Sequence, residues 1–143
     1  MKTLVISDQA LTVFALSEVL KQCDPTIQVV GAAHLGEAAA RLEQEADFEL
    51  IVLDIDIPGI HRTLGVNWVR QKWPDIPLTV LSAVEPDDDV VRSVDAGAMG
   101  YFVKTTDTEL LVHAFKQVLA GGFYLPEISP PSVSWEDLRQ ANA

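Results

Sequence analysis

Short apolar runs alternate along this chain with longer segments in which apolar residues recur at helical spacing. The runs are rich in valine, isoleucine and leucine, and they cover residues 4–6, 27–32, 49–54, 78–83 and 100–104. This alternation is typical of a parallel sheet whose strands are joined by helices that pack on both faces. The run at 49–54 is the most continuously apolar, which predicts a strand at the centre of the sheet.

The segments between these runs predict five helices. Helical periodicity and breaker residues place them at 10–23, 36–46, 66–72, 87–96 and 108–120. Asp24-Pro25 stops the first helix and Gly121-Gly122 the last. Five βα units joined by right-handed crossovers predict a flavodoxin-like, doubly wound sheet of five parallel strands in the order 2-1-3-4-5, in three α/β/α layers.

Length and charge limit the function classes. The chain has 143 residues, which suits one ordinary domain, and its formal net charge is −11. That charge has the wrong sign for direct binding to nucleic acid or to an anionic membrane. The apolar runs are far shorter than the roughly 20 residues of a membrane span, and Cys23 is the single cysteine. We therefore expect a cytoplasmic domain without a disulfide.

Polar residues follow four of the predicted strands. They are Ser7-Asp8, Asp54 with Asp56 two residues later, Ser82-Ala83 and Lys104. In an open α/β sheet the functional site lies outside the carboxyl ends of the strands, so these side chains are expected to converge. An isolated aspartate at a strand end is usually a turn or cap residue, but four coincident positions favour one shared site.

One group from each of four strand ends makes a set that suits phosphoryl transfer to a carboxylate: the carboxylates of Asp8 and Asp54, the Ser82 hydroxyl and the Lys104 ammonium. Oxygen ligands bind Mg²⁺, one aspartate acts as the nucleophile, and a lysine and a serine contact the phosphoryl oxygens. A lone aspartate repels a dianionic phosphoryl group by several kcal/mol at an effective dielectric constant near 20, so nearby cations are required.

The chain resembles the receiver domains of two-component response regulators, in particular those of the LuxR/NarL (FixJ) type. The resemblance covers residues 1 to about 125, and its most specific stretches are 53–59, 81–83 and 96–104. It implies that Asp54 is the phospho-acceptor, that Asp8 is a direct Mg²⁺ ligand, and that the backbone carbonyl of Asp56 is a further ligand. Asp54 itself would complete the metal site.

The same resemblance implies roles for three residues near the last two strands. Ser82 would bond the phosphoryl group and Lys104 would pair with it. Tyr101 would turn inward when Ser82 moves toward the phosphate; without the resemblance, an amphipathic surface position explains this tyrosine equally well. The receiver would catalyse only its own phosphorylation and dephosphorylation, so we expect no turnover enzyme.

Two positions depart from the pattern of the family. Ser7 stands where members usually carry the first of two adjacent acids; it could still orient a metal-bound water, but we expect weaker Mg²⁺ binding. After Pro58-Gly59 the chain has His61-Arg62 in place of an acidic residue and a glycine. This second departure puts the loop conformation, and with it the rate of phosphorylation, in question.

Two other functions compete with this interpretation. Asp54-Ile55-Asp56 resembles the nucleophile and acid pair of haloacid-dehalogenase phosphatases, although there the motif closes the first strand. A degenerate receiver that binds partners without phosphorylation is suggested by Ser7 and His61-Arg62. A nucleotide-binding module is disfavoured, because no glycine-rich phosphate loop follows any predicted strand.

The resemblance also implies partners. A sensor histidine kinase or phosphotransfer protein would supply the phosphoryl group, and activation would favour a homodimer. Residues 126–143 are expected to be a linker or tail, with a short polar helix from 134. Regulators of this type normally continue into a helix-turn-helix domain, so we expect a receiver fragment of a transcription factor rather than a stand-alone receiver. DNA would be bound only through that further domain, and no membrane is involved.

Overall fold

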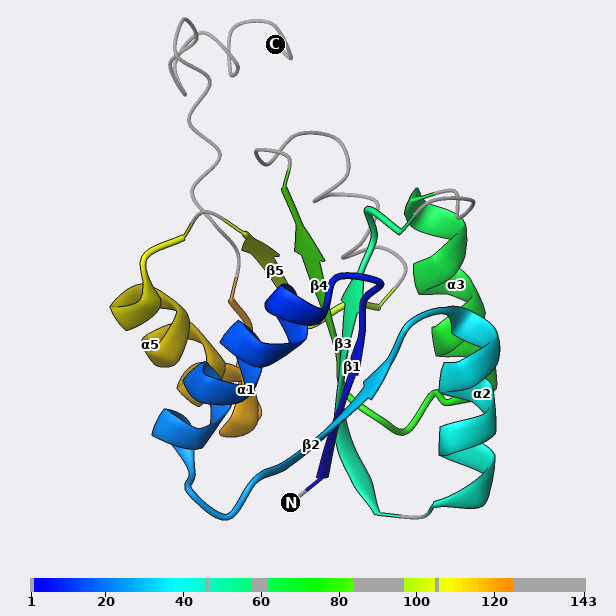
Figure 1. Cartoon of the computed structure of the whole chain (residues 1–143), viewed down its shortest axis with the longest axis horizontal. Coiled ribbons are helices and arrows are strands. Elements are labelled where there is room, and N and C mark those ends of the chain that lie inside the picture. Colours follow the sequence, from blue (N-terminus) through cyan, green and yellow to red (C-terminus); the bar gives the residue numbers. More distant parts are fainter. Residues whose placement is uncertain (1, 46, 58–61, 84–96, 105, 125–143) are drawn as a thin grey trace, which may run out of the picture.

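A single parallel sheet of five strands forms the middle layer of the computed structural model (Figure 1). The structure describes residues 2–45, 47–57, 62–83, 97–104 and 106–124. The strands are β1 (Lys2–Ile6), β2 (Gln28–Ala32), β3 (Phe48–Asp54), β4 (Leu78–Ser82) and β5 (Gly100–Val103). Their order is β2-β1-β3-β4-β5, as predicted, and all four pairings are parallel.

Helices cover both faces of this sheet. They are α1 (Ala10–Cys23), α2 (Leu35–Gln44), α3 (Arg62–Lys72) and α5 (Thr108–Leu119). Helices α1 and α5 lie on one face, and α2 and α3 lie on the other (Figure 1). The predicted flavodoxin-like α/β class and three-layer arrangement are therefore confirmed. The helix predicted at 87–96 and the linker or tail predicted at 126–143 lie outside the described residues.

Strand β3 has the central place that its apolar sequence predicts. It pairs with β1 on one side and β4 on the other, and of its seven residues only Glu49 is exposed. Its side chains alternate between the two core layers: Ile51 and Leu53 join the layer under α2 and α3, while Leu50 and Val52 join the layer under α1 and α5. Burial on both faces requires the nearly continuous apolar run.

The second core layer is built around aromatic stacking. Phe102 of β5 stacks on Phe115 of α5 with 4.2 Å between ring centroids, and on Tyr124 at 5.3 Å. Phe102 and Phe115 are almost completely buried. These contacts fix α5 against β5, and the parallel pairing of β5 with β4 places the two strand ends side by side.

Helix α3 begins earlier than predicted. The sequence places its start at Val66 because Gly65 is a poor helix former, whereas the helix runs from Arg62. Gly65 lies inside the helix and is buried. A single glycine costs a helix about 1 kcal/mol relative to alanine, an amount that packing against the sheet can offset.

The N-terminus of helix α2 is capped by a residue that apolar periodicity does not identify. The predicted range 36–46 shifts to Leu35–Gln44, and His34 is the N-cap. The His34 imidazole Nδ1 accepts a hydrogen bond from the backbone N–H of Glu37 at 3.1 Å. An imidazole thus takes the role that serine, threonine or aspartate usually fills.

Candidate phosphoryl-acceptor site

The register of the sheet brings the polar strand ends together. Asp54, the last residue of β3, pairs with Leu81 of β4, and Ser82 pairs with Val103 of β5. Lys104 follows directly, and its backbone N–H donates to the Ser82 carbonyl at 2.8 Å. Residues far apart in sequence therefore lie at one edge of the sheet because parallel strands end there together.

Asp54 is a buried carboxylate with a partner at each oxygen. Its side chain is only 1% exposed. Oδ2 accepts a hydrogen bond from Ser7 Oγ at 2.8 Å and lies 2.9 Å from Lys104 Nζ, while Oδ1 accepts from the backbone N–H of Asp56 at 2.9 Å. A buried charge requires such pairing, and here a cation and two neutral donors supply it.

Lys104 Nζ joins the two carboxylates of the site. Besides Asp54, it lies 3.3 Å from Asp56 Oδ2 and donates to Gln9 Oε1 at 3.3 Å. Burial alone lowers the pKa of Lys104, but the hydrogen bonds and charges of Asp54 and Asp56 outweigh it and raise the pKa above its usual value. The ammonium group is therefore held charged beside the Asp54 carboxylate.

The side chain of Asp56 lies at the shared site, as the sequence predicts, but its partners could not be predicted. The family resemblance implies a role only for its backbone carbonyl, whereas its Oδ2 accepts from the backbone N–H of Ala83 at 2.6 Å and its Oδ1 accepts from Ser82 Oγ at 3.3 Å. Together with Lys104, these groups form a three-donor set around one carboxylate. The Asp-x-Asp sequence marks both acids, but it does not indicate which donors the second acid binds.

Ser7 takes part in the site directly. Its side chain is buried, and its hydroxyl donates to Asp54 while accepting from the backbone N–H of Gln9 at 3.2 Å. The Ser7 hydroxyl therefore bonds the buried Asp54 carboxylate directly. Gln9, which contacts both Ser7 and Lys104, has no distinguishing sequence signal.

Asp8 lies at the same edge, but its side chain is exposed. Across the described ranges, no group of three or more histidine, cysteine, aspartate or glutamate side chains is arranged to hold a metal ion. Mg²⁺ usually needs only one or two carboxylates and keeps several waters. The oxygen donors at this edge, a buried carboxylate at Asp54 and an exposed one at Asp8, fit that chemistry.

Tyr101, the expected switch aromatic, is completely buried. It belongs to the core layer under α2 and α3, and its backbone N–H donates to the Tyr124 carbonyl at 3.1 Å. The surface position that an amphipathic strand would give it is therefore wrong. The ring of Tyr101 therefore points into the core.

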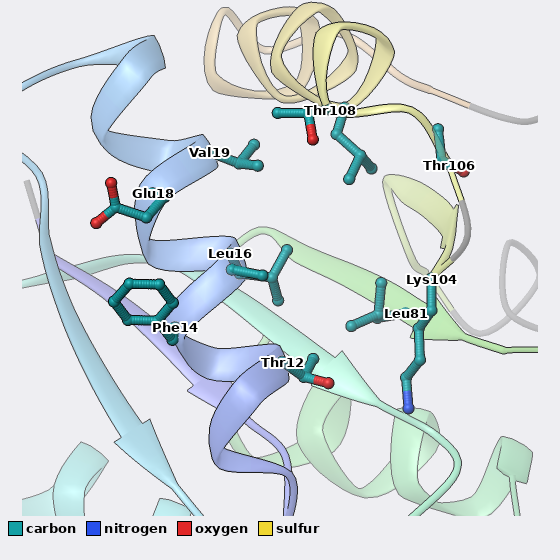
Figure 2. Close-up of a pocket in the computed structure, with 11 residues that line it drawn as sticks. Thr12, Phe14, Leu16, Glu18, Val19, Leu81, Lys104, Thr106 and Thr108 are labelled. Carbon is teal, nitrogen blue, oxygen red and sulfur yellow. The ribbon is translucent and has the colours of Figure 1, made fainter.

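A pocket of about 370 Å³ opens beside the site, between α1 and the end of β5 (Figure 2). Leu16 and Val19 of α1 and Leu81 of β4 line it, and Lys104 lines it as well. Phe14 of α1, which also lines the pocket, is 63% exposed. An apolar surface thus adjoins the site formed by Asp54, Asp56 and Lys104.

This arrangement can perform one kind of chemistry well. A buried carboxylate stands beside an ammonium group, with hydroxyl and backbone donors on the adjacent strand end. Preorganised donors of this kind stabilise charge that develops on a transferring phosphoryl group. Fold and site together define a flavodoxin-like α/β domain with a buried, cation-paired carboxylate at the carboxyl edge of its sheet.

Comparison with known proteins agrees with this class. Residues 3–116 match the family described as the response regulator receiver domain. The chain belongs to this family, and its relatives place it in the NarL/LuxR type of two-component response regulator. The haloacid-dehalogenase alternative is thereby set aside.

The sequence relatives are transcription regulators and response regulators. The chain is 33% identical over 129 residues to the response regulator GacA of Pseudomonas aeruginosa, covering 90% of this chain and 60% of that protein. It is 31% identical over 128 residues to the nitrate/nitrite response regulator NarL of Escherichia coli, covering 90% and 59%. The chain thus spans about three fifths of the length of these relatives.

Solved structures show the same fold. A LuxR family DNA-binding response regulator from Silicibacter pomeroyi superposes with a TM-score of 0.75 at 24% identity, covering 88% of this chain and 96% of that one. The isolated receiver domain of RcsB from Salmonella enterica gives a TM-score of 0.78 at 18% identity, covering 89% and 94%. Among the described residues, no helix combines the length and the apolar character needed to cross a membrane.

Proposed function

We propose that the chain accepts a phosphoryl group on Asp54 in a Mg²⁺-dependent reaction and thereby switches a transcriptional output. The observation that carries this proposal is the Asp54 carboxylate, buried to 1% exposure and lying 2.9 Å from Lys104 Nζ at the carboxyl edge of the sheet. A buried carboxylate with a cation at its side is suited to attack an anionic phosphoryl donor, because the cation offsets their repulsion.

The transfer forms an acyl phosphate. A carboxylate oxygen of Asp54 attacks phosphorus, and the bond from phosphorus to the leaving atom of the donor breaks with its electron pair on that atom. Later attack by water on phosphorus returns the Asp54 carboxylate and inorganic phosphate. The protein positions these groups and neutralises charge; it does not act as a turnover enzyme.

Mg²⁺ would be held by Asp54, Asp8 and the backbone carbonyl of Asp56, with Ser7 orienting a bound water. When bound, the ion supplies positive charge to the phosphoryl oxygens. Ser7 contributes no formal charge, so the site would have one acid fewer than the usual pattern of the family and should bind Mg²⁺ more weakly. Lys104 supplies the permanent part of the positive charge.

Ser82 and Tyr101 would transmit the change. A phosphoryl group on Asp54 would contact the Ser82 hydroxyl at the end of the neighbouring strand, and that contact would bias β4 and β5 toward one packing. Tyr101 on β5 would respond through its position in the core. The changed surface is then read by a partner or by a second copy of the chain.

The partners follow from this role. A phosphohistidine on a sensor kinase or phosphotransfer protein is the donor we propose, in the cytoplasm. Leu11 and Phe14 of α1 are 80% and 63% exposed, and they give such a protein an apolar surface next to the site. Because the relatives are transcription regulators of greater length, we propose that DNA is bound by a further domain of the same regulator and not by residues 1–125.

The test is incubation with Mg²⁺ and acetyl phosphate, followed by intact mass measurement. We expect one phosphoryl adduct on the wild-type chain and none on Asp54→Asn, which keeps the size of the side chain but removes the nucleophile. Asp75→Asn, an exposed acid near the other end of the sheet, is the charge-matched control and should label normally.

Two results would overturn the assignment. One is the absence of an adduct under conditions that label a known receiver, and the other is an adduct that persists in Asp54→Asn. The first of these would favour the second candidate, a receiver that binds its partners without phosphorylation. The loss of an acid at Ser7 is the observation that supports that candidate.

A further inference from the structure

Asp56 already holds the groups that a phosphoryl oxygen on Asp54 needs. One carboxylate accepts hydrogen bonds from the Ala83 backbone N–H at 2.6 Å and from Ser82 Oγ at 3.3 Å, and it pairs with Lys104 Nζ at 3.3 Å. A hydroxyl, a backbone amide and an ammonium form a set of donors typical of an anion site. We call these three groups the anion cradle.

The anion cradle adjoins the acceptor carboxylate. Lys104 Nζ contacts Asp54 Oδ2 and Asp56 Oδ2 at once, so the two acids share one cation. The backbone N–H of Asp56 donates to Asp54 Oδ1 at 2.9 Å, which ties the turn carrying Asp56 to the acceptor. This hydrogen bond fixes the backbone of Asp56 close to Asp54, and thereby places the Asp56 carboxylate within reach of the anion cradle.

We propose that Asp56 is a tethered competitor for the phosphoryl group: its carboxylate occupies the anion cradle in the unphosphorylated chain and must leave before Asp54 can be phosphorylated. This inference rests on the proposed function, and it adds a means by which phosphorylation of the same site is regulated. Both anions need the same donors, and leaving Asp56 in place would gather three negative groups around one lysine.

The side chain of Asp56 is able to move. It is 21% exposed, whereas Asp54 is 1% exposed, so Asp56 can turn toward water without leaving a buried charge unpaired. A competitor on a tether acts at a high effective concentration, which slows an incoming donor without blocking it. The expected consequence is slow phosphorylation in the wild-type chain.

Two variants separate this role from others. Asp56→Asn keeps the shape of the side chain but loses its charge, and Asp56→Ala removes both acceptor oxygens; each retains the backbone carbonyl. We expect both to label with acetyl phosphate faster than wild type. The expected gain is about tenfold, or about 1.4 kcal/mol of barrier, and is larger for alanine. Asp75→Asn matches the change in net charge and should label at the wild-type rate.

A second measurement tests whether the anion cradle binds phosphate, without any covalent step. Inorganic phosphate is titrated into ¹⁵N-labelled protein without Mg²⁺, and the amide resonance of Ala83 is followed. Phosphate should shift this resonance at several-fold lower concentration in Asp56→Ala than in wild type or Asp75→Asn, because the amide is no longer occupied.

The outcomes are distinct. The proposal that Asp56 competes with the phosphoryl group would be overturned if the variants labelled at the wild-type rate, or if phosphate shifted the Ala83 resonance at the same concentration in all proteins. Slower labelling together with weaker Mg²⁺ binding would also overturn it, because that result would show that the Asp56 side chain is a metal ligand. If no protein labels while a known receiver does, the proposed function fails, and the phosphate titration alone decides the role of Asp56.

Discussion

Lys104 Nζ lies 2.9 Å from Asp54 Oδ2, and the two groups come from neighbouring regions of the sheet edge that are 50 residues apart in sequence. The pair joins the end of β5 to the end of β3 across β4. It therefore contributes to stability as well as to the proposed chemistry, because removing the lysine leaves Asp54 buried with only neutral donors.

We expect Lys104→Met to lower the free energy of unfolding by about 1–3 kcal/mol at neutral pH. Breaking a fully buried pair costs about 3–5 kcal/mol, and the hydrogen bonds from Ser7 and Asp56 to Asp54 reduce that loss. Methionine keeps most of the aliphatic side chain. Urea unfolding measures the change, with Lys116→Met on the exposed face of α5 as the control.

The same loss should nearly vanish when Lys104→Met is made in Asp54→Asn, since no buried charge then remains unpaired. The difference between the two backgrounds is the coupling energy of the pair. Equal losses in both backgrounds would mean that Lys104 acts through packing rather than through its charge.

The pair also predicts a dependence of stability on alkaline pH. The pKa of Lys104 is raised above its ordinary value of 10.5 in the folded chain, so the folded state holds this proton more tightly than the unfolded state. The stabilisation is complete below the unfolded pKa and is lost as pH rises through the folded pKa. The free energy of unfolding should therefore fall more steeply above about pH 10.5 in wild type than in Lys104→Met, measured in EDTA. Parallel curves would contradict this.

Much of the site could be predicted because it depends on topology. Parallel strands with a fixed order end at one edge, so the residues that follow Ile6, Leu53, Leu81 and Val103 had to meet there. Apolar periodicity was enough to find those strand ends. Neither step requires knowledge of side-chain conformation.

The remaining features depend on conformations that periodicity does not encode. Asp56 could point to solvent or into the anion cradle, and the choice is made by the turn that ties its backbone to Asp54. His34 caps α2 through one ring nitrogen, although histidine is not a usual cap. Gly65 weakens the helical pattern in the sequence, whereas in the folded chain packing on the sheet can offset its cost to the helix.

Ser7→Asp should make stability depend on Mg²⁺. The new carboxylate would lie beside Asp54, and two charges about 4 Å apart repel by about 4 kcal/mol at an effective dielectric constant of 20. We expect unfolding in EDTA to require about 1–3 kcal/mol less free energy than in wild type. Saturating Mg²⁺ should recover this loss and stabilise the variant more than wild type.

Ser7→Ala is the control for the lost hydrogen bond, and it adds no charge. It should be destabilised with and without Mg²⁺ by a similar amount, about 1–3 kcal/mol. If Mg²⁺ stabilised Ser7→Asp no more than wild type, the cation would not be bound next to residue 7.

Phe102 and Phe14 offer a matched test of core and surface. Phe102 is 1% exposed and stacked between two rings, so Phe102→Ala should cost about 3–5 kcal/mol in urea unfolding. Phe14 is 63% exposed, so Phe14→Ala should change stability by no more than about 0.5 kcal/mol and should leave labelling by acetyl phosphate unchanged. A cost for Phe14→Ala approaching that of Phe102→Ala would mean that this ring belongs to the core. Near-zero cost would leave Phe14 available to a partner protein, because an exposed aromatic ring contributes to binding only when a partner covers it.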